Sequence, residues 1–330
     1  MSSTQNFVPP YPLSTAVLLL VFNRLDTTKQ VFEAIRQAKP PRLYVAADGP
    51  RRNKVGEAEC VREVRDYVVD NVDWDCEVKI LFREENLGCK YAVSGAITWF
   101  FENEEQGIVL EDDCLPNQSF FWFCEDGLNT WKNDERIAGI GGFVAMCNGE
   151  PFLSLHGSVW GWASWREVWQ KYDIDSGLND KDLIFLAKNA SLYTALEKSQ
   201  LSYKLKNQVA NTWDYYWLFT RIKLRKFMVL PGAPLISNIG FDPENSTHTK
   251  EHKPKSLKEL EAVKINLLNI NHTETITDFK KLSSLDFERI VGRFGGGRAF
   301  YTGLRFFLLR PFFNTKLLLA WIQSAIIKGT

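Results

Sequence analysis

The stretch Gly107-Ile108-Val109-Leu110-Glu111-Asp112-Asp113 places three adjacent carboxylates directly after a short apolar run. An apolar run of this length, bounded by polar residues, predicts a strand that is buried on both faces. Such a strand delivers all three acids to one edge of a sheet. Because adjacent anions repel one another and lose solvation, an opposite charge must compensate them. A hard divalent cation is one candidate, and a solvated acidic turn is the alternative.

Three further apolar runs precede this one, each followed by polar residues. The four predicted strands span residues 17–22, 43–47, 77–82 and 107–110. The predicted helices between them span 26–39, 57–69 and 88–103. Connections of this length allow crossovers between parallel strands. The sequence therefore predicts an α/β fold with a mostly parallel central sheet and helices on both faces.

Polar side chains follow each of the four predicted strands. They are Asn23-Arg24, Asp48, Glu85-Asn86 and Glu111 to Asp113. Because ligands of open α/β sheets bind beyond the carboxyl ends of the strands, these four clusters predict a single crevice. The chain contains neither GxGxxG nor GxxxxGK[ST], so dinucleotide and P-loop sites are not indicated. Phosphates bound in this crevice would need a metal ion instead.

The second half of the chain is less regular. Its predicted elements are a helix over 120–131 and strands over 137–147 and 231–239. Between them, Trp160, Trp162 and Trp165 surround a glycine at a spacing that fits neither a helix nor a strand. These tryptophans predict either an aromatic cluster that seals the core or a loop that stacks on a sugar ring.

Two single residues in this half carry candidate chemistry. Asp214 is the only carboxylate in the aromatic segment Thr212–Trp217. A carboxylate in that setting is suited to proton transfer, and a helix-capping aspartate is the alternative. His248 lies in a polar loop shortly after the predicted last strand. That position suits a metal ligand, and a surface histidine is the alternative.

The bulk composition excludes several classes of protein. Lysine plus arginine equals aspartate plus glutamate, 40 each in 330 residues, so no nucleic-acid partner is indicated. The six cysteines are scattered without a CxxC pair, which predicts reduced thiols of a cytoplasmic protein. The first residues do not resemble a signal peptide. No apolar run reaches the roughly 18–20 residues that span a bilayer.

The C-terminal segment Arg289–Thr330 has seven basic residues and no acidic residue. Large apolar residues are interleaved with them, notably Phe306–Leu309 and Leu317–Ile322. This combination predicts an interfacial anchor for an anionic membrane leaflet. The alternative is a C-terminal helix that packs on the catalytic domain or on a second copy of the chain.

The order of the motifs resembles a known family. Strand–Asn-Arg, strand–Ala-Asp-Gly-Pro, Glu-Asn-Leu-Gly and strand–Glu-Asp-Asp occur in the order typical of GT-A-fold glycosyltransferases. The later Gly-Trp-Ala-Ser-Trp-Arg, Trp-Asp-Tyr-Tyr-Trp and Ser-Thr-His-Thr blocks are similar to bacterial nucleotide-diphospho-sugar transferases, distant relatives of the N-acetylglucosaminyltransferase I group. The resemblance covers residues 14–250 or so, and it rests on the number and order of motifs that are individually weak.

The resemblance implies a role for each site residue. Asp113 would bind a Mn²⁺ or Mg²⁺ ion that bridges the donor diphosphate, and His248 would make a further metal or diphosphate contact. Asp214 matches the general base of inverting members. The residues implied to line the nucleotide-sugar site are Asn23, Arg24, Asp48, Asn86, Glu111, Asp112 and Trp162. The triplet reads Glu-Asp-Asp where the family has Asp-x-Asp, which leaves the division of labour between Asp112 and Asp113 open.

The function implied is metal-dependent, inverting transfer of a sugar from a nucleotide-diphosphate donor, expected to be a UDP-sugar. The acceptor would be a hydroxyl of a glycan or a lipid-linked glycan in bacterial surface polysaccharide synthesis. A cytoplasmic location is expected, peripheral on the inner face of the plasma membrane. A sugar-1-phosphate nucleotidyltransferase and an inactive carbohydrate-binding module are the alternatives. The first of these normally opens with a Gly-rich basic phosphate loop, which the residues after 17–22 do not provide.

The resemblance also implies how the chain is organised. The expected parts are a loose arm (1–13), a nucleotide-sugar-binding half (14–116), an acceptor-side half of the same domain (117–255) and a C-terminal helical extension (256–330).

Overall fold

The computed structural model describes residues 7–144, 149–155, 157, 159–189, 198, 201–202, 205 and 211–240. The strands are β1 (Val17–Val21), β2 (Arg42–Ala47), β3 (Glu77–Phe82), β4 (Gln106–Glu111), β5 (Cys114–Pro116), β6 (Ile137–Gly141), β7 (Phe152–Ser154), β8 (Trp162–Trp165), β9 (Phe227–Leu230) and β10 (Ile236–Asn238). The helices are α1 (Leu25–Ala38), α2 (Glu57–Asp70), α3 (Gly88–Asn103), α4 (Gln118–Trp131), α5 (Arg166–Trp169), α6 (Asp180–Asn189) and α8 (Asp214–Leu224).

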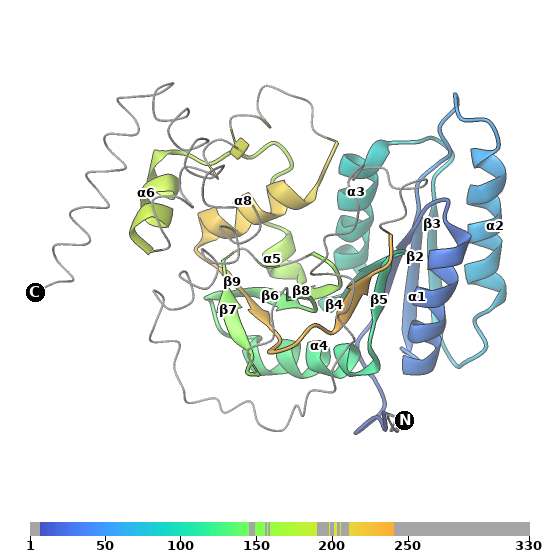
Figure 1. Ribbon diagram of the computed structural model, residues 1–330, viewed down its shortest axis with the longest axis horizontal. Coiled ribbons are helices and arrows are strands. Elements are labelled where there is room, and N and C mark those ends of the chain that lie inside the picture. Colours follow the sequence, from blue (N-terminus) through green and yellow to red (C-terminus); the bar gives the residue numbers. More distant parts are fainter. Residues whose placement is uncertain are drawn as a thin grey trace, which may run out of the picture.

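One large sheet forms the centre of the molecule (Figure 1). Its eight strands have the order β3-β2-β1-β4-β8-β6-β9-β7. The first four are parallel to one another. β1 lies between β2 and β4, and its first residue, Val17, pairs with Leu43 of β2 and with Ile108 of β4. β8 and β7 run antiparallel to their neighbours, whereas β6 and β9 are parallel. The sheet is therefore mostly parallel.

Helices cover both faces of this sheet. α3 packs on β1, β2 and β4, and α5 lies against it. α4 packs on β4, β6 and β8, and it contacts α1, which in turn contacts α2. In Figure 1, α3 lies on one side of the strands β1–β3 and α1 and α2 lie on the other, while α5 and α8 lie above β6, β8 and β9 and α4 lies below them. These layers confirm the predicted α/β fold.

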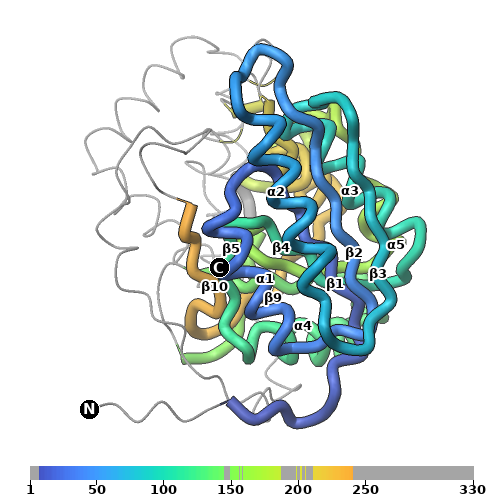
Figure 2. Tube along the Cα trace, turned by 90° about the vertical axis from the view of Figure 1, so that its right-hand side faces the viewer, coloured from blue at the N-terminus to red at the C-terminus, as the bar shows by residue number. Residues whose placement is uncertain are grey.

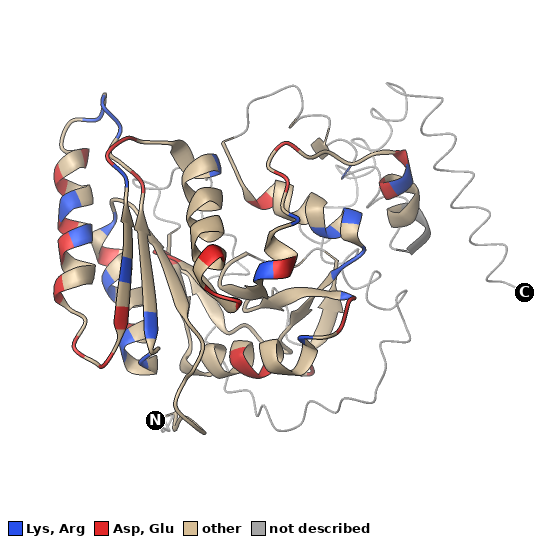
Figure 3. Ribbon diagram, turned by 180° about the vertical axis from the view of Figure 1, so that it is seen from behind, with Lys and Arg blue, Asp and Glu red and all other residues tan. Residues whose placement is uncertain are grey.

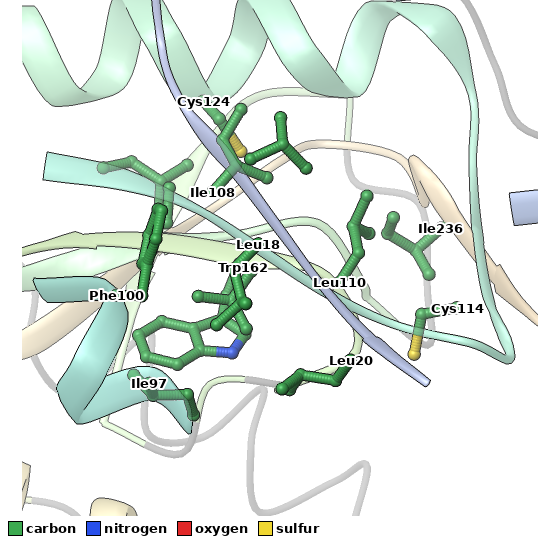
Figure 4. Packing of buried hydrophobic residues seen from close by; sticks show 14 of the residues in the cluster. Leu18, Leu20, Ile97, Phe100, Ile108, Leu110, Cys114, Cys124, Trp162 and Ile236 are labelled. Atoms are coloured by element: carbon green, nitrogen blue, oxygen red, sulfur yellow. The ribbon is translucent and has the colours of Figure 1, made fainter. Parts of the chain in front are cut away.

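The central strands are apolar because both of their faces are covered. All residues of β1 are buried, as are Leu43–Ala47 of β2 and Gly107–Leu110 of β4. Leu18, Ile108 and Leu110 meet side chains of the flanking elements in one continuous core (Figure 4). Burial of each such side chain contributes about 1.5–3 kcal/mol to folding. The continuous apolar runs follow from this two-sided burial.

The outer helix α2 shows the opposite composition. Acidic and basic residues alternate along it (Figure 3), and Glu59 and Arg62 form an ion pair one turn apart. Its buried stripe consists of Val61, Val64 and Val68. This is the pattern expected of a helix with one face on the sheet and the other in solvent.

The second half of the chain departs from the prediction in three places. The strand expected over 137–147 ends at Gly141. The strand expected over 231–239 is β10, residues 236–238 only, and it pairs with β5 in a separate two-stranded sheet, visible side by side in Figure 2. The stretch expected to be neither helix nor strand contains β8, which inserts between β4 and β6. Tertiary pairing decides such short strands more than local pattern does.

Among the described residues, no helix has the length and apolarity needed to cross a bilayer. The predicted C-terminal extension, 256–330, lies outside the described residues. The predicted boundaries between the parts of the chain stay predictions.

Candidate active site

The strand order reverses at β1, and we call the region beyond the carboxyl ends of β1 and β4 the crevice. The chain proceeds from β1 to β2 and β3 in one direction, while β4 lies on the other side of β1. Ligands of open α/β sheets bind at such a reversal, outside the carboxyl ends of the strands. Arg24 follows β1 here, and Asp112 and Asp113 follow β4. The topology thus brings a cation and two anions to one place.

Arg24 binds both aspartates of the acidic triplet. Its Nη2 donates to Oδ1 of Asp112 and, at 3.0 Å, to Oδ2 of Asp113. Burial alone would lower the pKa of Arg24, but the charges of Asp112 and Asp113 outweigh it and raise that pKa. Arg24 was expected to line the nucleotide-sugar site, and its contact with a nucleotide stays a prediction. The compensating charge that the triplet requires is therefore supplied, at least in part, by this side chain.

Asp112 and Asp113 differ in their access to solvent. Asp112 is buried, and its Oδ2 accepts from the backbone N–H of Phe22 at 3.3 Å. Burial raises the pKa of Asp112 to about 6, although Arg24 opposes the shift. The side chain of Asp113 is 19% exposed, against 6% for Asp112. Asp113 is therefore the more accessible of the two to an incoming ligand.

Glu111 is the last residue of β4, whereas Asp112 lies in the turn that follows the strand. Burial raises the pKa of Glu111 well above its usual range, and the charges of Asp113, Asp112 and Asp214 add to the shift. Burial likewise raises the pKa of the Cys89 thiol to about 12, with Glu111 and Asp214 as the largest charges acting on it. The charges of Glu111 and Asp214 thus both act at the first turn of α3, where Cys89 lies.

Asp214 is the first residue of α8 and is half-buried. Its Oδ1 accepts a hydrogen bond from the Thr212 hydroxyl. The hydroxyl of Tyr172 donates to the carbonyl of Trp213 at 3.1 Å, which fixes the residue before Asp214. The N-cap residue of α8 is Trp213, whose side chain makes no capping hydrogen bond. The carboxylate is positioned by its neighbours and partly open to solvent.

Asp48 and Asn86 hold the strand-end loops together. Asp48 is buried, and its carboxylate accepts from the backbone N–H groups of Gly49, Leu87 and Gly88 at 2.9, 3.0 and 2.9 Å. Asn86 donates to the carbonyl of Gly49 at 2.7 Å. The carboxylate of Asp48 thereby caps α3, which has no capping side chain of its own at Leu87. Both residues shape the crevice, and their contact with a nucleotide stays a prediction.

Asn23 lies on the other side of the same loops. Its Nδ2 donates to Oε1 of Glu57 at 3.0 Å, and Glu57 is also bound by Arg51. Arg51 in turn stacks over Phe22, 5.5 Å from the ring centre. These contacts fix the segment between β1 and Arg24 against the start of α2.

Three residues that matter here were not singled out from the sequence. Asn211 accepts from the backbone N–H of Lys90 at 2.9 Å and so completes the cap of α3. The Lys90 ammonium lies 4.3 Å from the centre of the Tyr216 ring and 3.2 Å from Asp175. Gly240 passes over the ion pair, where an added Cβ would lie 2.2 Å from Oδ2 of Asp113. No local pattern marks these contacts, because each joins segments far apart in the chain.

Trp162 lies in the core. It is 1% exposed and packs against Trp169, Trp213 and Trp217 at ring-centre distances of 5.9, 5.9 and 5.4 Å. Figure 4 shows it among the other buried side chains. This placement agrees with the core-sealing alternative, because no ring face is open for stacking on a sugar.

The residues at the crevice fit a particular kind of metal site. In the described part of the chain, no group of three His, Cys, Asp or Glu side chains is arranged to hold a metal ion. His248 lies outside the described residues. Mg²⁺ commonly binds one or two carboxylates and completes its shell with substrate phosphates and water. Asp113, with Asp112 beside it, fits that mode and not an all-protein cage.

Comparison with known proteins identifies no family. No protein-family model matches the chain, and no curated protein matches it. Similar solved structures include HddC from Yersinia pseudotuberculosis, which is 12% identical over 48% of this chain and 80% of its own, with a TM-score of 0.31. The same protein complexed with GMP-PN is 12% identical over 46% and 77% of the two chains, with a TM-score of 0.30.

A third similar structure is the mannosyltransferase PcManGT from Pyrobaculum calidifontis in complex with GDP-Man and Mn²⁺. It is 13% identical and covers 96% of this chain and 81% of its own, with a TM-score of 0.36. At TM-scores below 0.5, none of these similarities carries an inference about chemistry. The interpretation of the crevice rests on its own residues.

Proposed function

We propose that the protein is a metal-dependent, inverting glycosyltransferase. It would move a sugar from a nucleotide-diphosphate donor, a UDP-sugar by expectation, to a hydroxyl of a glycan or lipid-linked acceptor. One observation carries the proposal. The charges of Asp113, Asp112 and Asp214 all act on the buried carboxyl group of Glu111 at the end of β4, near Arg24, although Asp214 is about a hundred residues away in sequence.

The donor would bind at the β1–β4 side of this crevice. Asp113, with Asp112 beside it, would hold Mn²⁺ or Mg²⁺, and His248 would be a further ligand. The bound ion would neutralise the charge that builds on the leaving diphosphate. Asn23 and Asn86 would face the nucleotide, and Glu111 the donor sugar. Asp48 would act by shaping the loops, since its oxygens are engaged by three backbone N–H groups.

Asp214 would act as the general base. Its carboxylate is half-buried, next to the charge of Glu111, and held by Thr212. It would take the proton of the acceptor hydroxyl as that oxygen attacks the anomeric carbon from the side opposite the diphosphate. One in-line displacement inverts the anomeric configuration and needs no covalent intermediate.

The test is a screen of nucleotide sugars with the full chain, with Mn²⁺ present or removed by EDTA. A matching donor should raise the unfolding free energy by RT ln(1 + [L]/Kd), about 2.7 kcal/mol at a hundredfold excess over Kd. The same donor should be hydrolysed slowly or transferred only when metal is present. If none of the nucleotide sugars stabilises the protein, with or without metal, the proposal is contradicted.

The nucleotidyltransferase alternative has its own signature. Such an enzyme would release pyrophosphate from a nucleoside triphosphate and a sugar 1-phosphate. The described loop after β1 carries a single basic residue, Arg24, and no glycine before α1. Pyrophosphate release under these conditions would favour that alternative over glycosyl transfer, and donor binding without turnover would favour an inactive binding module.

A further inference from the structure

We infer that Arg24 is a displaceable counter-cation, which holds Asp112 and Asp113 until a divalent ion and a nucleoside diphosphate arrive together and then binds the diphosphate. The inference rests on the proposed function and adds to it a mechanism that couples metal binding to nucleotide binding. It concerns the side chain of Arg24 and the order in which its partners exchange.

The first observation is that one nitrogen serves both aspartates. Nη2 of Arg24 donates to Oδ1 of Asp112 and to Oδ2 of Asp113, the latter at 3.0 Å. The guanidinium therefore lies where the two carboxylates approach each other. A metal ion that used both carboxylates would need the same place. Two cations that bind the same pair of carboxylates would lie close together and repel each other strongly. Arg24 and the metal ion therefore exclude each other at this position.

The second observation is that the space around the pair is limited. An added Cβ at Gly240 would lie 2.2 Å from Oδ2 of Asp113 and 2.7 Å from Nη1 of Arg24. The backbone N–H of Ile239 also donates to the carbonyl of Asp113 at 2.8 Å, which fixes this segment over the pair. The chain after β10 thus closes one side, so a metal cannot bind beside an unmoved guanidinium from that direction.

The third observation concerns exposure. The side chain of Arg24 is 21% exposed, while Asp112 is 6% exposed. The arginine therefore has an outlet to solvent, and the aspartate does not. An exchange of cations would proceed by movement of Arg24, because the buried carboxylate is held in place by Phe22.

These observations predict cooperative binding of metal and nucleotide. A metal ion alone must break two charge-assisted hydrogen bonds and leave Arg24 without an anionic partner. A metal ion with a diphosphate offers the displaced guanidinium phosphate oxygens, for which its planar fork is well suited. The coupling is reciprocal, so each ligand should tighten the binding of the other by the same factor.

Arg24 is inferred to compete with the metal ion and to bind the diphosphate, so removing its charge should change the affinities for Mn²⁺ and for nucleotide in opposite directions. Mn²⁺ affinity is measured from the electron paramagnetic resonance signal of the free ion, without nucleotide, for wild type and Arg24→Gln. UDP and GDP affinities are measured by calorimetry with saturating Mn²⁺. Charge-assisted hydrogen bonds contribute enough that Arg24→Gln should bind Mn²⁺ alone about tenfold more tightly. The same variant should bind the preferred nucleotide about tenfold more weakly, because phosphate contacts of this kind contribute similarly.

The matched control is Arg42→Gln. Arg42 pairs with Glu104 at 2.7 Å, with 35% and 11% exposed side chains, at the other end of β2. Its removal deletes an arginine–carboxylate pair of similar burial without touching the triplet. Both affinities should be unchanged in this variant, whereas a general loss of stability would affect the two variants alike.

Each remaining outcome has a definite meaning. If wild type binds Mn²⁺ and Arg24→Gln binds it equally or more weakly, the inference is wrong while the proposed function stands. If wild type binds neither Mn²⁺ nor a nucleotide with Mn²⁺, the proposed function is wrong. If Arg24→Gln does not fold, Arg24→Lys replaces it. Lysine keeps the positive charge but lacks the planar fork, so UDP or GDP with saturating Mn²⁺ should bind more weakly than to wild type, and unchanged nucleotide affinity would overturn the inference.

Discussion

At the scale of single residues, the crevice is an arrangement of charges that burial makes costly. Asp112 is almost fully buried, yet its partners are Arg24 and one backbone N–H. Burial raises the pKa of Asp112 to about 6 and that of Glu111 well above its usual range. Strongly shifted carboxylates in a crevice are typical of functional sites, because folding alone does not favour them.

Asp113→Asn should weaken metal-dependent donor binding and leave the fold intact. The amide keeps the size of the side chain but loses the negative charge that a divalent ion needs. Loss of a partner outside the metal shell already costs about 10–100-fold in affinity, so loss of a direct ligand should cost at least as much. Donor affinity with and without Mn²⁺ is the measurement.

The control for this variant is Asp134→Asn. Asp134 forms an ion pair with Arg136 at 2.6 Å, before the start of β6 and hence at the opposite edge of the sheet. Donor affinity should be unchanged there. Wild-type metal dependence in Asp113→Asn would mean that Asp113 does not bind the ion.

Asp214→Asn should abolish transfer while donor and metal binding persist. A neutral amide cannot take the acceptor proton, so kcat should fall by the general-base contribution, about 10²–10⁴-fold. Product analysis of the wild type should also show inverted anomeric configuration, for example a β-linked product from an α-linked donor.

Asp173→Asn is the matched control for the base. Asp173 is exposed and accepts from the backbone N–H of Asp175 at 3.1 Å. It follows Tyr172, whose hydroxyl binds the carbonyl of Trp213, so Asp173 is another carboxylate near Asp214 in the chain's fold. Full activity of Asp214→Asn with loss of activity in Asp173→Asn would reassign the base. A retained anomeric configuration would rule out the one-step mechanism.

At the scale of elements, the start of α3 is built by residues from elsewhere. Asp48 from the end of β2 binds the N–H groups of Leu87 and Gly88, and Asn211 from the loop before α8 binds that of Lys90. The helix therefore joins the donor side of the crevice to the segment that carries Asp214. Gly49 permits this arrangement, since the backbone of Glu85 lies against it.

Gly49→Ala should destabilise the protein by about 1–3 kcal/mol, the usual cost of overpacking. The added Cβ would lie 2.4 Å from the backbone carbon of Glu85, which cannot move without shifting the loop before α3. The measurement is the midpoint of urea unfolding.

Gly95→Ala provides the contrast within the same layer. Its Cβ would meet only the end of the flexible Arg83 side chain, at 3.0 Å, in the interior of α3. Alanine is favoured over glycine in a helix by about 0.5–1 kcal/mol, so this variant should be as stable as wild type or more stable. Equal destabilisation by the two substitutions would show that the close approach at Gly49 is not the cause.

At the scale of the whole molecule, the described residues form the sheet and its two helical layers. The basic C-terminal segment is predicted to bind an anionic membrane surface. Arg289–Thr330 carries seven basic residues and no acid. The full chain should therefore bind vesicles that contain anionic lipid, with binding weakened by salt.

Neutralising Arg305, Arg310 and Lys316 to Gln should weaken vesicle binding, since each basic residue near an anionic surface contributes about 1 kcal/mol. Sedimentation with vesicles is the measurement. A control that neutralises the exposed residues Arg52, Arg62 and Lys132 removes the same charge from the described part of the chain. Equal loss in both triple variants would favour non-specific attraction, and no loss in either would favour packing on the protein.

Most elements of the first half of the chain could be predicted from its sequence. The elements expected over 77–82 and 88–103 agree with β3 and α3 residue for residue. β1 and β2 differ from prediction by one residue at one end. β1 and β2 were predictable because strands buried on both faces must be apolar throughout, whereas β3 is a partly buried edge strand that was recognised as a short, mostly apolar run.

The pairing of the charges in the crevice depends on the tertiary structure. The sequence placed Arg24, Asp112 and Asp113 at strand ends, but the reversal of strand order between β1 and β4 brought them into contact. The pairing of β8 between β4 and β6 likewise places Trp162 in the core. The physical reason is the same in each case. The local sequence pattern indicates which residues are buried and whether a segment is a helix or a strand. The hydrogen bond between Arg24 and Asp112 joins residues 88 positions apart, so it depends on how the whole sheet is assembled.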